Sequence, residues 1–153
     1  MNLLAIYDQG NGMVSEIYPA PEARRAGEGD AAFVSRIAVR DAPSGAPLRL
    51  VTLQQLPDGD FRDAWRFGAQ EPTIDMDHAK EIQKGKWRVA REPLLKALDV
   101  EMLRAVEEDD KVKLARIAKD KQDLRDVTAT DLSAVSTPAE LKAVWPTVLG
   151  AKR

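Results

Sequence analysis

The sequence predicts an α+β fold, in which a small N-terminal antiparallel β module precedes an antiparallel helical hairpin and a short C-terminal helix. Residues 1–70 hold short apolar runs separated by turns rich in glycine and proline. Residues 74–153 instead repeat apolar side chains at helical spacing. The composition changes at the same place, since all ten lysines lie after residue 73 and seven arginines lie before it. We therefore expect two domains, a β-rich module over 1–70 and a helical part over 74–153.

The first part predicts three or four short strands. Asn11-Gly12 stands between two apolar runs, and because both residues tolerate positive φ, the pair predicts a β-hairpin. Residues 32–40 and 48–53 are rich in β-branched and apolar side chains, which predicts two further strands. Residues 20–31 show no apolar periodicity and predict a loop. So small a sheet needs another surface against which to bury its apolar face.

A long helix is predicted over residues 76–107, and either Asp75 or Asp77 can cap its start. Its apolar side chains recur every three or four residues and so share one face; they are Trp87, Ala90, Leu94, Leu98, Met102 and Ala105. Pro93 costs ~3 kcal/mol in a helix interior. We therefore expect either a kink near 91–93 or two helices that meet there.

The chain then reverses. Four consecutive acids at 107–110 disfavour continued helix through like-charge repulsion. Residues 111–127 carry an apolar stripe and predict the returning helix of an antiparallel hairpin. Near the C-terminus, Thr137, Pro138 and Glu140 stand at the N-cap, N1 and N3 positions of a capping box, which predicts a short helix.

The composition argues against several classes of function. The absence of cysteine removes disulfides, thiolate catalysis and cysteine zinc sites. A net charge of −2 gives no overall basic field to hold nucleic acid. No apolar run approaches the ~20 residues of a membrane span, and the first residues lack the features of a signal peptide. We expect a protein made in the cytoplasm that binds neither nucleic acid nor membrane.

The single histidine follows two acids, and Asp75, Asp77 and His78 together could suggest a metal site. Residues 77 and 78 point about 100° apart on a helix, however, so an acid-rich helix start is the favoured interpretation. The acids at 107–110 lack the ligand spacing and the glycine of an EF-hand, which favours a solvated turn. No nucleophile–base pair or phosphate loop is evident. We expect no enzyme and no catalytic, cofactor-binding or metal-binding residue.

The stretch FRDAWRF (61–67) interleaves aromatic residues with arginines. Such a pattern could stack on nucleotide bases. In strand geometry, however, Phe61, Trp65 and Phe67 share one face and the arginines share the other, and no basic groove accompanies them. We predict that the three aromatic residues form a structural seam, which closes the β-rich module and docks it on the start of the helical part.

A two-helix hairpin buries only one stripe of each helix, so further apolar side chains remain outside: Val89, Leu95, Val100, Leu103, Val106 and Val112. The C-terminal helix can cover some of them. The others can serve in self-association, dock on another protein or pack on the N-terminal sheet, and the sequence leaves these alternatives open. The candidates for partner binding are Trp87, Leu95, Leu103, Val106 and Trp145.

Taken together, these segments resemble a family of short proteins encoded in the tail region of tailed bacteriophages, near tail fibre genes. RDAPSGAPLRLVTLQQLPDGDFRDAW (40–65) is similar to that family's lead-in to an F-R-x-A-W motif. The resemblance continues in IDMDHAKEI (74–82), AREPLLKALDVEMLRAVE (90–107), KQDLRDVT (121–128) and STPAELKAVWP (136–146). The lysine-rich KVKLARIAKDK departs from it, because similar proteins are more alanine-rich there.

The resemblance implies an association with the phage tail, baseplate or tail fibre. The first hypothesis is a non-enzymatic structural or adaptor subunit, made in the host cytoplasm and retained in the virion. The alternative is a cytoplasmic chaperone for tail or tail-fibre assembly that is not retained. Both imply other tail, baseplate or fibre proteins as partners, and a homo-oligomer is compatible with either. The family carries no catalytic residues over to this chain.

Overall fold

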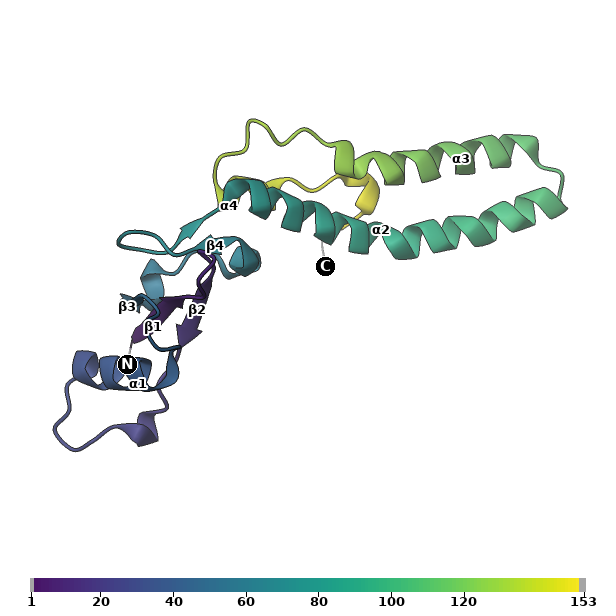
Figure 1. Cartoon of the computed structure of the whole chain (residues 1–153). Helices are drawn as coiled ribbons and strands as arrows, with labels where there is room; N and C mark the ends of the chain where they lie inside the picture. Colours follow the sequence, from purple (N-terminus) through teal and green to yellow (C-terminus); the bar gives the residue numbers. More distant parts are fainter. Residues whose placement is uncertain (1, 152–153) are drawn as a thin grey trace. The chain divides into compact units, whose positions relative to one another are not determined.

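The computed structural model describes residues 2–151 and confirms the α+β class (Figure 1). A small antiparallel sheet comes first, followed by two long helices that pack together and a short C-terminal helix. The chain divides into two compact units between Ala79 and Lys80. This division falls inside helix α2 (Met76–Glu107), a few residues after the predicted boundary, so one helix contributes to both units.

In the first unit, strand β1 (Leu3–Asp8) lies between β2 (Val14–Ile17) and β3 (Leu48–Thr52), and both pairings are antiparallel. The predicted hairpin at Asn11-Gly12 joins β1 to β2. Its positive φ angles fall on Gly10 and Gly12, at 94° and 79°. The Asp8 carboxylate accepts from both of these glycine N–H groups at 2.9 Å and so stabilises a loop longer than a two-residue turn.

Residues 32–40 do not form the predicted strand. They belong to helix α1 (Asp30–Asp41), which follows the predicted loop and a short 3-10 turn at Pro21–Ala23. The reason is their spacing, because the buried side chains of α1 fall on one helical face; they are Phe33, Val34, Ile37 and Ala38. This helical period overrides the β propensity of the valines and isoleucine.

Both faces of the small sheet are covered within the first unit. Ala5 of β1 packs against Val34 and Ala38, so α1 covers one face. Its neighbours Leu4 and Ile6 point to the other face because strand side chains alternate. That second face is covered by the segment of β4 (Trp65–Arg66), which pairs with β5 (Thr73–Ile74).

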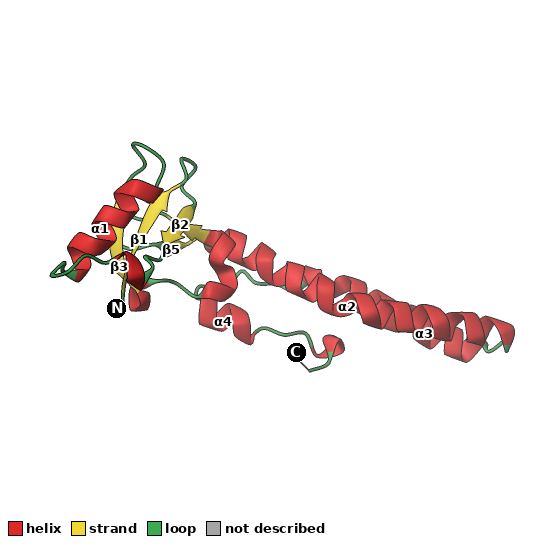
Figure 2. Cartoon of the chain, turned by 90° about the horizontal axis from the view of Figure 1, so that it is seen from below, coloured by secondary structure: helices red, strands yellow, loops and turns green. Residues whose placement is uncertain are grey.

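In the second unit, α2 and α3 (Lys111–Asp126) run side by side in opposite directions (Figures 1 and 2). The expected alternative of two helices meeting at 91–93 is wrong, because α2 continues through Pro93 as one helix. The helix bends along its course instead (Figure 1). Pro93 lies on the exposed side of α2, where water can solvate the carbonyl that lacks its N–H partner. Ion pairs join the two helices, with Arg116 2.9 Å from Glu101.

The predicted reversal at 107–110 and the predicted cap of the C-terminal helix are confirmed, and the structure adds a cap at the start of α3. The acidic turn ends α2 at Glu107, and Asp110 caps α3 by accepting from the N–H of Lys113 at 2.9 Å. Helix α4 (Pro138–Ala143) has the predicted capping box. The Glu140 N–H donates to the Thr137 hydroxyl at 3.2 Å, and the Thr137 N–H donates back to the Glu140 carboxylate at 3.1 Å. Within residues 2–151, no helix is long and apolar enough to cross a bilayer.

Candidate functional site

The second unit carries an apolar groove of about 730 Å³ between α2 and the segment after α4. Its lining is Gly85, Lys86, Val89, Ala90, Pro93, Leu94, Trp145, Leu149 and Ala151. Gly85 leaves space in the groove wall, since a Cβ built there meets no other atom within 4 Å. Aliphatic and aromatic side chains thus dominate the lining, which is typical of a binding surface for another apolar group.

Hydrogen bonds shape the second wall of this groove, which is the segment after α4. The chain becomes extended at Val144, and the buried Gln83 side chain of α2 donates to the Val144 carbonyl at 3.2 Å. The Trp145 indole N–H donates to the Gly150 carbonyl at 2.9 Å, which closes a short 3-10 turn over Thr147–Leu149. These contacts hold the aromatic ring beside α2 without enclosing it.

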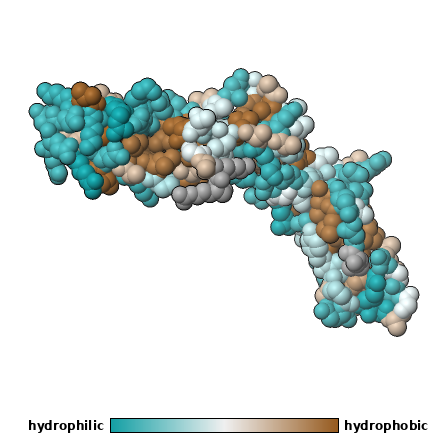
Figure 3. Space-filling view, turned by 180° about the vertical axis from the view of Figure 1, so that it is seen from behind, coloured by the Kyte–Doolittle hydropathy of each residue, from teal (hydrophilic) through white to brown (hydrophobic). Residues whose placement is uncertain are grey.

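Large apolar side chains also remain exposed along the helices, and Figure 3 shows such patches between hydrophilic ones. Their exposed fractions are 76% for Val89, 51% for Val100, 66% for Leu103, 59% for Val106 and 83% for Val112. Four of these residues lie on α2 and Val112 lies on α3, and so many exposed apolar side chains on one hairpin are more than the scattered single residues expected of an ordinary surface. Together with the groove, they form the candidate partner-binding surface of the second unit.

The predicted partner-binding residues divide between this surface and the interior. Leu103 and Val106 are exposed, Leu95 is half-buried, and the half-buried Trp145 lines the groove. Trp87 is fully buried and so does not reach a partner. Its position on the apolar face of α2 was predicted, but its burial depends on the C-terminal segment that covers this part of the helix.

The FRDAWRF stretch is not one continuous strand, because residues 61–64 lie in a 3-10 segment, Gly59–Ala64. Asp58 starts that segment by accepting from the Asp60 N–H at 2.9 Å. Phe61 and Trp65 are nevertheless buried, and Phe67 is half-buried with the Arg49 guanidinium 4.9 Å from its ring centroid. All three aromatic residues therefore lie within the packing of the first unit.

Trp65 covers one face of the three-stranded sheet. It packs with Leu4, Ile6 and Val51, and its indole N–H donates to the Asp58 carbonyl at 3.1 Å. The Asp75 N–H donates to the Ala64 carbonyl at 2.9 Å, which links this stretch to the residue before α2. Docking of the seam on the second unit stays a prediction.

The arginines of the stretch take part in local ion pairs. Arg62 lies 2.5 Å from the Glu16 carboxylate, and Arg66 lies 3.1 Å from Asp75 and 3.0 Å from Nδ1 of His78. Asp75 also accepts from the His78 N–H at 3.1 Å, so it is the cap of α2. This hydrogen bond, followed by the charge of Arg66, lowers the pKa of the Asp75 carboxyl. The cluster thus fixes the start of α2.

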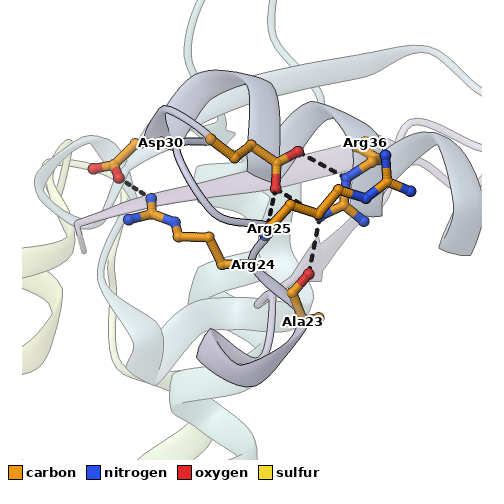
Figure 4. A network of polar contacts seen from close by, with 6 residues as sticks. Ala23, Arg24, Arg25, Asp30 and Arg36 are labelled. Atoms are coloured by element: carbon orange, nitrogen blue, oxygen red, sulfur yellow. Dashed lines mark hydrogen bonds and ion pairs between the residues drawn. The ribbon is translucent and has the colours of Figure 1, made fainter.

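A second polar network lies at the start of α1 (Figure 4). The Arg36 guanidinium donates twice to the Glu28 carboxylate at 2.7 Å and once to the Ala23 carbonyl at 2.9 Å. Arg24 pairs with Asp30, and both arginines lie over the ring of Phe33. The hydrogen bond from Arg36 lowers the pKa of Glu28 to about 2. These contacts hold the 20–30 loop on α1.

Neither network has the composition of a metal centre. Among residues 2–151, no three His, Cys, Asp or Glu side chains lie close enough together to hold a metal ion. The sequence of this chain matches no family model and no curated protein, and its fold matches no solved structure. The groove and the exposed helix faces are therefore the features on which a function can be argued.

Proposed function

We propose that this chain is a non-enzymatic protein of a bacteriophage tail, a structural or adaptor subunit of the tail, baseplate or tail-fibre region. The observation that supports it most directly is the exposed apolar surface of the second unit, because exposed apolar patches beside an apolar groove mark sites of protein association. The viral context rests on the resemblance of residues 40–146 to short phage tail-module proteins.

The helical unit has a core of its own, so its exposed side chains are not left over from incomplete packing. Side chains from α2, α3 and the C-terminal segment fill that core: Trp87, Ala105, Ile117, Leu124, Leu132 and Leu141. Leu103 and Val106 lie within two residues of Ala105 in the sequence, yet they remain more than half exposed. An adaptor needs this combination of a folded scaffold and an apolar surface for its neighbours.

Mass spectrometry of purified virions of a phage that encodes the chain tests the proposal. We expect peptides of this protein in mature particles at a fixed ratio to the tail proteins. A protein that binds an unassembled tail or fibre protein in infected cells, but is absent from particles, would contradict the structural version and support the assembly chaperone instead.

A matched pair of variants tests the part played by the helical surface. Val106→Asp places a charge on that surface, whereas Val39→Asp places one on α1 of the first unit, where Val39 is 72% exposed. Both changes are at exposed sites, so neither should unfold the protein. We expect Val106→Asp to reduce the amount of the protein in particles and Val39→Asp to leave it unchanged. Equal incorporation of the two variants would exclude this surface.

A further inference from the structure

The exposed side of α2 carries residues at the spacing of a coiled-coil contact. Steps of four, three, four and three residues connect Val89, Pro93, Lys96, Val100 and Leu103, which we call the outer stripe. This alternation places them along one line of the helix. Four of the five are apolar and one, Lys96, is charged. The opposite side of α2 holds the buried Trp87 and Ala105, so the outer stripe faces away from the core.

The charges of α2 change sign along the same helix. Residues 80–96 contain six basic and two acidic side chains, a net charge of +4. Residues 97–110 contain one basic and six acidic side chains, a net charge of −5. The extremes are KGKWR at 84–88 and EEDD at 107–110, which lie at opposite ends of the outer stripe.

We propose that the outer stripe binds a second copy of this chain in the antiparallel orientation, so that residues 84–88 of one copy lie along 107–110 of the other. This orientation brings opposite charges together at both ends of the contact, whereas a parallel pair would bring like charges together at both ends. The complementary charges identify the partner as a second copy. The inference uses only α2 and the acidic turn that follows it, and it holds whether or not the protein belongs to a phage tail.

Some of these charges have only an exposed partner within the chain or none, whereas Lys84 already lies 3.3 Å from Glu81 and Asp110 caps α3. Glu107 and Asp109 have no ion-pair partner among residues 2–151, and the exposed Glu108 has only a 3.5 Å pair with the half-buried Lys113. At the basic end, Arg88 lies 3.7 Å from Glu81, and both side chains are at least half exposed. Exposed pairs of this kind contribute little stability, so exchanging them for pairs across a dimer costs little.

The apolar residues fix the register of the two copies. When Val89 of one copy lies level with residue 107 of the other, Pro93 lies level with Leu103 and Lys96 with Val100. Leu103 of each copy is then placed beside the Pro93 end of the other copy's groove. Lys96 can lay its methylene groups over Val100 and keep its ammonium group in water, beside Glu92 at 3.5 Å.

The absence of native cysteine makes disulfide cross-linking a clean test of orientation. Val89→Cys and Glu107→Cys are prepared in the full chain, separately and mixed, under mild oxidation. In the antiparallel dimer, the two copies of residue 89 lie about 27 Å apart along the helix axis, as do the two copies of residue 107. We therefore expect a cross-linked dimer only in the mixture. Cross-linking of each variant with itself would show a parallel pair and overturn the proposal.

Mass measurement by light scattering tests the contact itself. We expect Leu103→Asp to raise the dimer Kd about tenfold or more, as loss of a central apolar contact does, and Val39→Asp to leave it unchanged. The inference would be overturned by a wild-type chain that stays monomeric at high concentration, together with a mixture of Val89→Cys and Glu107→Cys that forms no cross-link. That result would leave the proposed function open to its own test, because incorporation into particles is measured separately.

Discussion

Replacing Trp65 with alanine removes the largest side chain on one face of the β sheet. Trp65 is 4% exposed and packs with Leu4, Ile6, Val14 and Val51. Truncating a buried tryptophan to alanine costs ~3–5 kcal/mol through lost apolar burial and the cavity that remains. The variant also loses the hydrogen bond to the Asp58 carbonyl, which contributes about 1 kcal/mol. Since domains are stable by about 5–15 kcal/mol, the first unit would lose much of its stability.

Urea unfolding followed by two signals measures this loss in each unit. The two tryptophans that remain, Trp87 and Trp145, both lie in the second unit, so their fluorescence reports on it alone. Circular dichroism reports on both units. If Trp65 stabilises only the first unit, Trp65→Ala shifts an early transition in circular dichroism but has the same fluorescence midpoint as Trp65→Phe, which keeps the same two tryptophans. If the aromatic seam also docks the first unit on the second, both midpoints shift together.

Two controls separate core packing from other effects. Trp65→Phe keeps an aromatic ring and loses the hydrogen bond, so we expect a smaller cost than for alanine. Val39→Ala changes an exposed side chain on α1 and should alter the free energy of unfolding by less than about 0.5 kcal/mol. A Trp65→Ala protein that unfolds at the wild-type urea concentration with the same slope would refute the packing argument.

Three further predictions concern single sites. The pKa of Glu28 is lowered from 4.5 to about 2, so ionised Glu28 stabilises the fold above pH 4.5 and this contribution is lost as the pH falls through 2. The stability difference between wild type and Glu28→Gln, measured by urea unfolding from pH 2 to 6, should therefore shrink toward low pH. A difference that stays constant with pH would contradict this prediction. Thr137→Ala removes the α4 cap and should cost ~1 kcal/mol in urea unfolding, with Thr147→Ala as the control, because Thr147 is exposed and caps no helix. Pro93→Ala should raise the stability of the second unit by up to ~3 kcal/mol, since α2 continues through this position; a lower midpoint would show that the proline is needed.

The elements that the sequence predicts correctly are those with local signals. The β1–β2 hairpin follows from Asn11-Gly12, and α4 follows from a capping box within four residues. The acidic turn at 107–110 also needs no distant contact, because its repulsion and the Asp110 cap act within one turn of helix. Each of these features is decided by neighbours in the chain, which a sequence displays directly.

The sequence misses two kinds of feature. In one, two local signals compete, and in the other, residues distant in the sequence pack together. Helix α1 was predicted as a strand because its β-branched residues outweighed the four-residue spacing of Phe33 and Ile37. The return of the C-terminal segment to α2, seen in the Gln83–Val144 hydrogen bond, joins residues some sixty positions apart and has no local signal. The groove has the same origin, since its two walls are separated by the whole of α3 in the sequence.

Lys96 explains how a helix can keep an exposed apolar stripe and still limit what binds to it. In a parallel pair in register, Lys96 of one copy faces Lys96 of the other, and the acids at 107–110 face each other as well. In the antiparallel pair, Lys96 lies beside Val100, and the acids meet a basic segment. The stripe therefore gains affinity from Val100 and Leu103 and orientation from its charges. Exchanging Lys96 for leucine should strengthen association but allow both orientations, so that Val89→Cys would then begin to cross-link with itself.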